Sequence, residues 1–139
     1  MRTIRDVQVG DELPAFPKVV TRESVKAYAD ASGDDNPLHQ EDEVARAAGF
    51  PGIIAHGMFA MAHLTTCITS WTGDPAALRR MRAQFRAPVF MGETMIAGGR
   101  VVEEDAGGRV VLDVWVAVER DGVTEYPIRR SRAELVLPV

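Results

Sequence analysis

The distribution of apolar and polar positions divides the chain into a helical first half and a strand-forming second half. Between residues 22 and 31, the apolar side chains of Val25, Tyr28 and Ala29 recur at helical spacing. Gly33 then stands where a helix commonly ends in the left-handed conformation. The pattern therefore predicts a helix over residues 22–31, followed by a turn.

Two further helices are expected before the strand-forming half begins. Residues 41–48 start with three acidic side chains, which favour the positive end of a helix dipole, and Gly49 follows them as a stop signal. The stretch 57–70 contains no Asp, Glu, Lys or Arg and is apolar on nearly every face, which predicts a buried helix. Residues 1–20 contain two prolines and are expected to form edge or irregular structure.

The second half alternates with a period of two, which is typical of a strand with one buried face. The clearest alternation pairs Leu112, Val114, Val116 and Val118 with Asp113, Trp115, Ala117 and Glu119. Turn signals at residues 106–108 and 121–122 flank this segment. We predict an antiparallel meander with strands near residues 82–90, 94–104, 109–119 and 128–137.

The composition of the chain limits the classes of protein to which it can belong. The 139 residues, 46% of them hydrophobic, are enough for one domain spanning residues 1–139. The net charge of -4 and the dispersed arginines argue against a nucleic-acid partner. The single cysteine, Cys67, excludes an internal disulfide and favours a reducing compartment. With no secretory signal and no apolar run long enough to span a bilayer, we expect a cytoplasmic protein without a membrane partner.

The candidate chemistry lies in two short motifs, Gly33-Asp34-Asp35-Asn36-Pro37-Leu38-His39 and His56-Gly57-Met58. Asp34 and His39 stand five residues apart across an Asn-Pro turn, which cannot continue as a helix. Gly57 lies at the entrance of the long apolar helix, where unpaired N–H groups and the helix dipole favour negative charge. A carboxylate, an imidazole and a helix start indicate proton transfer beside a polarised carbonyl group.

These residues resemble a known family. The segments 32–39, 54–58 and 85–93 look like those of the MaoC-like hydratases, which comprise (R)-specific enoyl-CoA hydratases and 3-hydroxyacyl-thioester dehydratases. The resemblance implies the α+β class and a hotdog fold, in which an antiparallel sheet wraps around a long central helix. It also implies a homodimer, or a heterodimer with a second hotdog chain, whose thioester tunnels lie at the interface.

The resemblance also implies roles for single residues. Asp34 and His39 would activate the water that adds to a trans-2-enoyl thioester, giving an (R)-3-hydroxyacyl thioester, and dehydration is the reverse. The backbone N–H of Gly57 would face the thioester oxygen. No metal or redox cofactor is implied. Coenzyme A or phosphopantetheine would be part of the substrate.

Six further residues are expected to support this site or bind its substrate. Asn36 is expected to brace the motif loop by bonds to the backbone, and His56 to cap or pack at the helix entrance. Thr65 falls where some family members carry a serine. As a hypothesis, a basic cluster contacts the substrate phosphates, through Arg79, Arg80 and Arg86.

Other interpretations remain open. Asp34 could be an ordinary turn residue. The chain could be the catalytic subunit of a heteromeric dehydratase or, less in keeping with a central helix free of Asp and Glu, a hotdog thioesterase. A metal site built from His39, His56 and His63 lacks close ligand spacing, and His63 is expected to be a core residue. Dinucleotide-binding, P-loop and serine-hydrolase motifs are absent.

Overall fold

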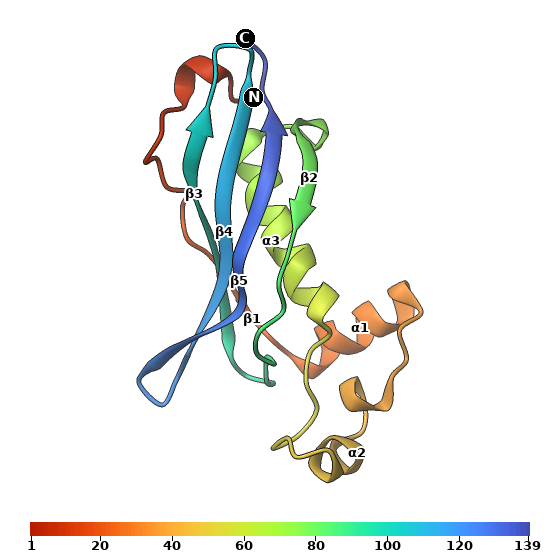
Figure 1. The fold of residues 1–139 in the computed structure, drawn as a ribbon. Coiled ribbons are helices and arrows are strands. Elements are labelled where there is room, and N and C mark those ends of the chain that lie inside the picture. Colours follow the sequence, from red (N-terminus) through yellow and green to blue (C-terminus); the bar gives the residue numbers. More distant parts are fainter.

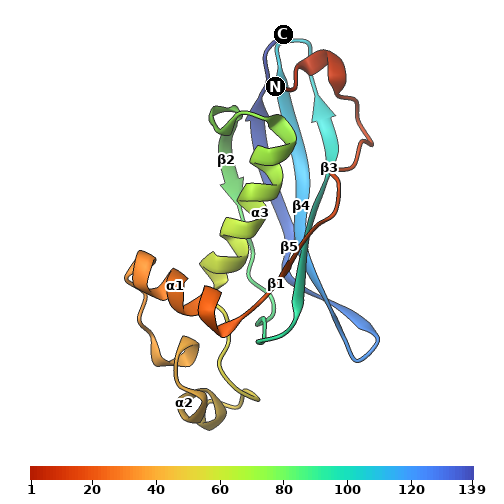
Figure 2. The same cartoon turned by 180° about the vertical axis from the view of Figure 1, so that it is seen from behind.

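A curled antiparallel sheet packs against one long helix in the computed structural model, which describes residues 1–139. The sheet has the strand order β1-β3-β4-β5-β2. Figure 1 shows α3 behind the sheet, and Figure 2 shows it lying along the inner face, with α1 and α2 beyond its N-terminal end. The elements are β1 (Phe16–Val19), α1 (Arg22–Ser32), α2 (Asp42–Ala47), α3 (Gly57–Thr72), β2 (Leu78–Arg82), β3 (Thr94–Glu104), β4 (Arg109–Arg120) and β5 (Val123–Val136), with 3₁₀ turns at Ile4–Asp6, Pro37–His39 and Pro75–Ala77.

The fold class and all three predicted helices are confirmed. Thr21 caps α1 by accepting the N–H of Ser24, and Gly33 ends it with a φ of 77°. The apolar helix α3 runs two residues beyond its predicted end, because Gly73 supplies the left-handed stop. None of the helices is both long and apolar enough to cross a bilayer.

The prediction of a strand over residues 82–90 is wrong. The strand β2 occupies Leu78–Arg82, and the chain after it forms only isolated bridges at Phe85 and Phe90. Pro88 has no N–H to donate to a sheet ladder, which argues against a regular strand there. The segment instead lies against the start of α3.

The predicted four-stranded meander is also wrong in its order. β2 pairs with β5 at one edge of the sheet, so only β3, β4 and β5 form a meander, while β1 pairs with β3 at the other edge. β5 begins five residues before its predicted start, because Asp121 and Gly122 form a two-residue turn with φ values of 54° and 76°. Positive φ at both positions matches the right-handed twist of a hairpin.

The core lies between α3 and the inner face of the sheet. α3 has almost no charged surface to hydrate, so it can be buried on its sheet-facing side. Leu64 and Ile68 of α3 are fully buried, as are Met95, Leu112, Ile128 and Leu135 of the facing strands. Cys67 is a free thiol in this core, and burial raises its pKa to about 11. This packing sets the position of α3 relative to the sheet, and with it the position of its first turn.

His63 ties the middle of α3 to the edge strand β1. Its side chain is buried, and Nε2 donates to the carbonyl oxygen of Phe16 over 2.7 Å. The prediction of a hydrogen-bonded core histidine is therefore confirmed. Burial lowers the pKa of His63, an effect that the hydrogen bond to Phe16 opposes and the charge of Lys18 reinforces.

Leu64→Ala should lower the free energy of unfolding by about 2–5 kcal/mol, because it leaves a cavity beneath the sheet. Urea unfolding followed by circular dichroism measures this, and Thr66→Ala, which changes an exposed position of the same helix, serves as the control. Equal losses in the two variants would contradict the placement of the core.

The stability of the protein should fall as the pH drops from about 7.5 to 5.5, in part because of His63. The unfolded chain takes up a proton near the ordinary histidine pKa of ~6.5, whereas the folded state resists protonation until a lower pH. Urea midpoints across this range should fall less steeply for His63→Gln. An unchanged pH slope in the variant would overturn the assignment.

Candidate active site

The motif loop after α1 is held by local hydrogen bonds. Gly33 ends α1, and Asn36 then accepts the N–H of Leu38 at 3.0 Å, which starts the 3₁₀ turn Pro37–His39. This is the bracing bond expected of Asn36. Asp34 is exposed, and its carboxylate accepts the N–H of Asn36 at 3.4 Å.

Loop 50–55 fixes the ring of His39. Nδ1 of His39 lies 2.7 Å from the carbonyl oxygen of Ile54, so this nitrogen carries the proton and Nε2 keeps its lone pair. The N–H of Ile54 donates to the carbonyl oxygen of Leu38 at 3.0 Å. The two bonds orient an imidazole whose basic nitrogen is free to take a proton.

Asp42, at the start of α2, holds the same loop from its other side. Its carboxylate accepts the N–H of Ile53 at 3.0 Å and pairs with Arg22 of α1 at 2.7 Å. The hydrogen bond from Ile53, together with Arg22, lowers the pKa of Asp42. Asp42 therefore remains a carboxylate at neutral pH and steadies the carbonyl that orients His39.

His56 joins the loop to the start of α3. Its ring is only 2% exposed, and Nε2 donates to the backbone oxygen of Asp34 over 3.0 Å. The ring stacks on that of His39, with centroids 3.9 Å apart, and Tyr28 meets it edge-on at 5.0 Å. His56 makes no capping bond to the helix, so of the two roles expected for it, packing is the one observed.

The start of α3 leaves the N–H of Gly57 free. The backbone and side-chain hydrogen bonds include none from this donor, as is usual in the first turn of a helix. A Cβ at this position would lie 3.2 Å from the ring of Phe85, so a side chain would crowd the approach. Glycine keeps the amide accessible at the positive end of the helix dipole.

These groups border one open pocket of about 310 Å³. Its lining residues come chiefly from the start of α3, the chain between α1 and α3, and the segment after β2. Figure 1 shows these segments close together at one end of the fold. Its walls are mainly apolar, and they include His39, His56, Gly57, Phe85, Arg86 and Val89. An apolar cleft with a few convergent polar groups is the usual form of a small-molecule site.

Asp34 does not line this pocket, but its carboxylate lies close to His39 and His56, which do. One side-chain atom each of Asp34, His39 and His56 lie within 4.8 Å of one another. A single water molecule can bridge two groups at such a separation by hydrogen bonds of about 2.8 Å. The cluster also has the residue types of a metal site. However, stacked imidazoles direct their lone pairs in near-parallel planes rather than toward one point, so the arrangement suits a hydrogen-bonded oxygen better than an ion.

Of the four remaining predicted site residues, the structure places one at the pocket and three away from it. Arg86 borders the pocket, where it donates to the side chain of Gln84. Arg79 binds the carbonyl oxygen of Ala76, and Arg80 lines a different hollow, so only Arg86 of the three lies at this pocket. A contact between one of them and the substrate phosphates stays a prediction. The Thr65 hydroxyl donates to Met61 in its own helix and does not line the pocket.

An ion pair that was not predicted from the sequence supports one wall of the pocket. Arg120 of β4 donates to both carboxylate oxygens of Glu93, at 2.7 and 2.8 Å, and to the carbonyl oxygen of Pro88 at 3.0 Å. The bonds to Glu93 raise the pKa of Arg120 further. The wall segment is thus anchored to the sheet by a bidentate pair.

Comparison with known sequences gives a consistent result. The sequence profile of the MaoC like domain matches residues 6–122. The chain is 44% identical over 69 residues to peroxisomal enoyl-CoA hydratase 2 of Arabidopsis thaliana, an alignment that covers 47% of this chain and 22% of the relative. It is 35% identical over 99 residues to 3-hydroxyacyl-thioester dehydratase X of Mycobacterium tuberculosis, covering 71% of this chain and 34% of the relative.

Solved structures share the fold. A MaoC-like dehydratase superposes with a TM-score of 0.87 at 29% identity, over 97% of this chain and 42% of the other. The chain therefore spans between about a fifth and a third of the length of the two curated relatives, and less than half of this structural neighbour.

The hydrogen bonds predict the tautomer of each histidine. His39 should carry its proton on Nδ1, whereas His56 and His63 should carry theirs on Nε2, because those nitrogens face carbonyl oxygens. Long-range ¹H–¹⁵N correlation spectra near pH 8 distinguish the two forms. A proton on Nε2 of His39 would contradict the orientation of its free lone pair.

Proposed function

The chain belongs to the MaoC-like domain family, and we propose that it reversibly hydrates trans-2-enoyl thioesters to (R)-3-hydroxyacyl thioesters. The observation that carries the proposal is that His39 and the free N–H of Gly57 border one pocket, with the carboxylate of Asp34 close to His39. The two relatives with hydratase and dehydratase names support it. Hydration and dehydration are the two directions of one reaction.

Asp34 and His39 hold one water molecule in the proposed mechanism. The pair accepts one proton as the water oxygen bonds to C3 of the enoyl group, and it returns one proton to C2, so the elements of water are added. Positioned proton transfer of this kind contributes ~10²- to 10⁴-fold to the rate. Because both groups lie on one side of the bound substrate, the hydroxyl forms with a single configuration.

The N–H of Gly57 stabilises the charge that develops on the thioester oxygen. As C3 is attacked, electron density moves through C2 to the carbonyl, which takes on enolate character. A preorganised donor aimed at such an oxygen contributes about 3–4 kcal/mol. The start of α3 adds its dipole, and the neighbouring ring of Phe85 limits the access of water.

His56 has a positioning role in this scheme. It holds the backbone of Asp34 by a hydrogen bond and the ring of His39 by stacking, and it directly precedes Gly57. Two groups of the motif loop and the start of α3 are therefore kept in register by one buried side chain.

The substrate is proposed to arrive on coenzyme A or on the phosphopantetheine arm of a carrier protein, with no metal or redox cofactor. Arg86 is the one arginine of the predicted basic cluster that borders the pocket, and it is a candidate contact for that arm. Met58 and Phe85 beside the pocket are half exposed, at 51% and 50%. We expect a second hotdog chain, identical or not, to cover them and complete the acyl tunnel.

Asp34→Asn and His39→Ala should each lower the turnover number by ~10²- to 10⁴-fold, because each removes one member of the pair that holds water. The assay follows the loss of enoyl absorbance with crotonyl-CoA and longer enoyl-CoA substrates. Asp35→Asn is the matched control, since Asp35 is exposed in the same loop and makes no hydrogen bond through its side chain.

Circular dichroism should show that all three variants are folded. Near-normal turnover in either Asp34→Asn or His39→Ala would remove the assignment. If the chain is inactive alone, adding a co-purified hotdog partner distinguishes a heteromeric enzyme from a wrong assignment.

A further inference from the structure

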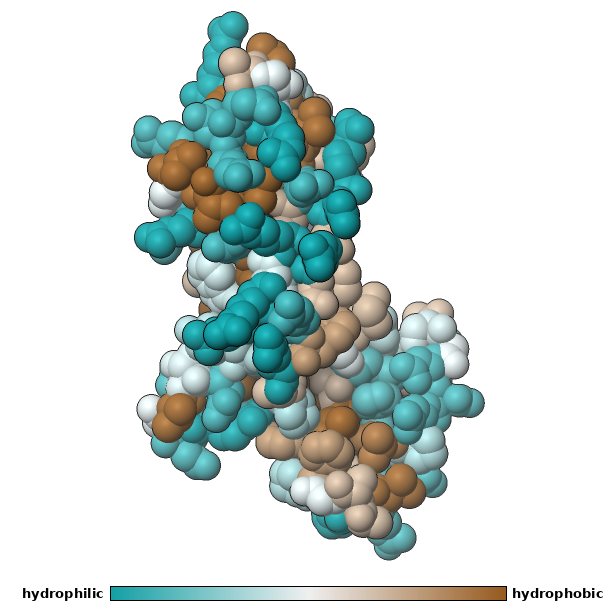
Figure 3. Space-filling view, in the orientation of Figure 1, coloured by the Kyte–Doolittle hydropathy of each residue, from teal (hydrophilic) through white to brown (hydrophobic).

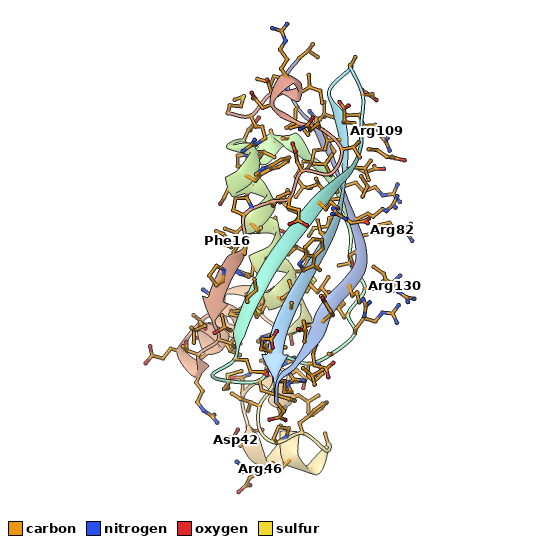
Figure 4. All side chains as sticks on the ribbon, turned by 90° about the vertical axis from the view of Figure 1, so that its left-hand side faces the viewer. Phe16, Asp42, Arg46, Arg82, Arg109 and Arg130 are labelled. Atoms are coloured by element: carbon orange, nitrogen blue, oxygen red, sulfur yellow. The ribbon has the colours of Figure 1, made fainter.

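A basic hollow of about 920 Å³ lies on the outer face of the sheet, which is the face turned away from α3. Seven arginines and four carboxylates line it, a surplus of three positive charges in a chain whose net charge is -4. Figure 4 shows Arg82, Arg109 and Arg130 extending from this face, and Figure 3 shows how largely hydrophilic the surface is. The hollow is separate from the pocket at the start of α3.

The arginines of the hollow fall into two groups. Three of them pair with carboxylates: Arg100 with Glu12, Arg109 with Glu103 and Glu134, and Arg132 with Asp113. The other four take part in none of the ion pairs of the chain, and they are Arg80, Arg82, Arg129 and Arg130. The unneutralised charge is therefore concentrated on β2 and the middle of β5.

The strands place like charges opposite each other at this point. Arg82 of β2 is the direct cross-strand partner of Arg132 of β5. Two cations at facing positions of an antiparallel pair destabilise a sheet. Asp113, the residue of β4 that pairs with Arg132, is bonded to Arg132 rather than to Arg82. The charge of Arg82 is therefore not neutralised by an ion pair within the chain.

A bulge in β5 presents two more guanidinium groups. Val114 pairs with Ser131 and Val116 pairs with Ile128, so β5 carries one residue more than β4 between these pairs. Arg130 lies in this bulge with a φ of 52°, a conformation that costs energy for any residue except glycine. A bulge of this kind redirects side chains.

The bulge is held from the side of β2. Ser131 donates to the carbonyl oxygen of Arg129 at 3.0 Å and accepts the N–H of Gln84 at 2.9 Å. The strained segment is therefore fixed rather than frayed. The segment therefore holds the unpaired guanidinium groups of Arg129 and Arg130 in place at the hollow.

Aromatic rings complete the hollow. The indole of Trp115 lies over Gly98 on the neighbouring strand, where an added Cβ would come within 2.6–2.9 Å of three ring atoms. The ring is only partly buried, so its other face is open to the hollow. Tyr126 lies beside it in the lining, with the guanidinium of Arg129 4.9 Å from its ring.

We propose that this outer hollow binds a nucleotide with two or more phosphate groups, using Arg82, Arg129 and Arg130 for the phosphates and Trp115 as a stacking surface for the base. Guanidinium groups match phosphate oxygens in pairs, and aromatic faces stack on bases. The volume falls within the range of small-molecule sites, and a concave shape fits such a ligand better than a protein surface. The site goes beyond the proposed hydratase reaction and does not depend on it.

Isothermal titration calorimetry of the full chain at low ionic strength tests this proposal. ADP should bind at one site per chain, adenosine on the order of tenfold or more weakly, and added salt should weaken the binding of ADP. Coenzyme A should bind as ADP does, since it carries the same pyrophosphate. Asp34→Asn should leave the affinity for ADP unchanged, so that failure here and failure of the hydratase assignment are distinguishable.

Variants locate the site. Arg82→Gln and Arg130→Gly should each weaken ADP binding by on the order of tenfold or more. Arg5→Gln removes one charge from an exposed position outside the hollow and should change ADP binding little. Arg130→Gly should also raise the melting temperature by roughly 2–4 °C, because glycine adopts the observed φ without strain.

Three results would overturn the proposal. They are the failure of ADP to bind at millimolar concentration, equal binding of ADP by all three arginine variants, and binding of a poly-glutamate peptide where ADP does not bind. The last result would identify a docking surface for an acidic protein instead.

Discussion

The burial of His56 at the start of α3 is the interaction on which the candidate active site depends. A helix without charged residues can bury its inner side against the sheet, and this packing determines where its first turn lies. His56 then occupies the junction between that turn and the motif loop, with Nε2 bonded to the backbone of Asp34 and its ring against that of His39. Without this junction, the loop that carries Asp34 and His39 and the helix start at Gly57 would be two unrelated surface segments.

The two faces of the sheet differ in polarity and charge. The inner face is apolar and holds α3, while the outer face carries arginines that its carboxylates only partly neutralise. The segment after β2 connects the two, because Gln84 is bonded to Ser131 beside the outer hollow and Phe85 contacts Gly57 at the inner pocket. Its irregular path, which Pro88 favours, is what allows one short segment to serve both places.

The sequence predicted the elements that local patterns determine. The uncharged stretch from residue 57 and the alternation from residue 112 identified α3 and β4, and the loop motif identified Asp34 and His39. The pairing of β2 with β5 was not predictable. Alternation shows that one face of a strand is buried, but it does not show which strand lies beside it in the sheet. For the same reason Arg80 and Arg86, six residues apart, were assigned to one cluster, although the chain leaves the sheet between them.

Two features had no local signal at all. The unpaired arginines of the outer hollow can be recognised only when the pairing of β2, β4 and β5 is known, since the register decides that Arg82 faces Arg132. Likewise, the bond between Arg120 and Glu93 joins residues 27 apart in the sequence. Both depend on long-range pairing, which residue spacing alone does not contain.

The most direct measurement is a crystal structure of Asp34→Asn with a bound (R)-3-hydroxyacyl-CoA. The thioester oxygen should lie about 3 Å from the backbone nitrogen of Gly57, and the 3-hydroxyl should contact both the residue-34 amide and Nε2 of His39. An acyl chain bound elsewhere, or a thioester oxygen turned away from the start of α3, would contradict the proposed chemistry.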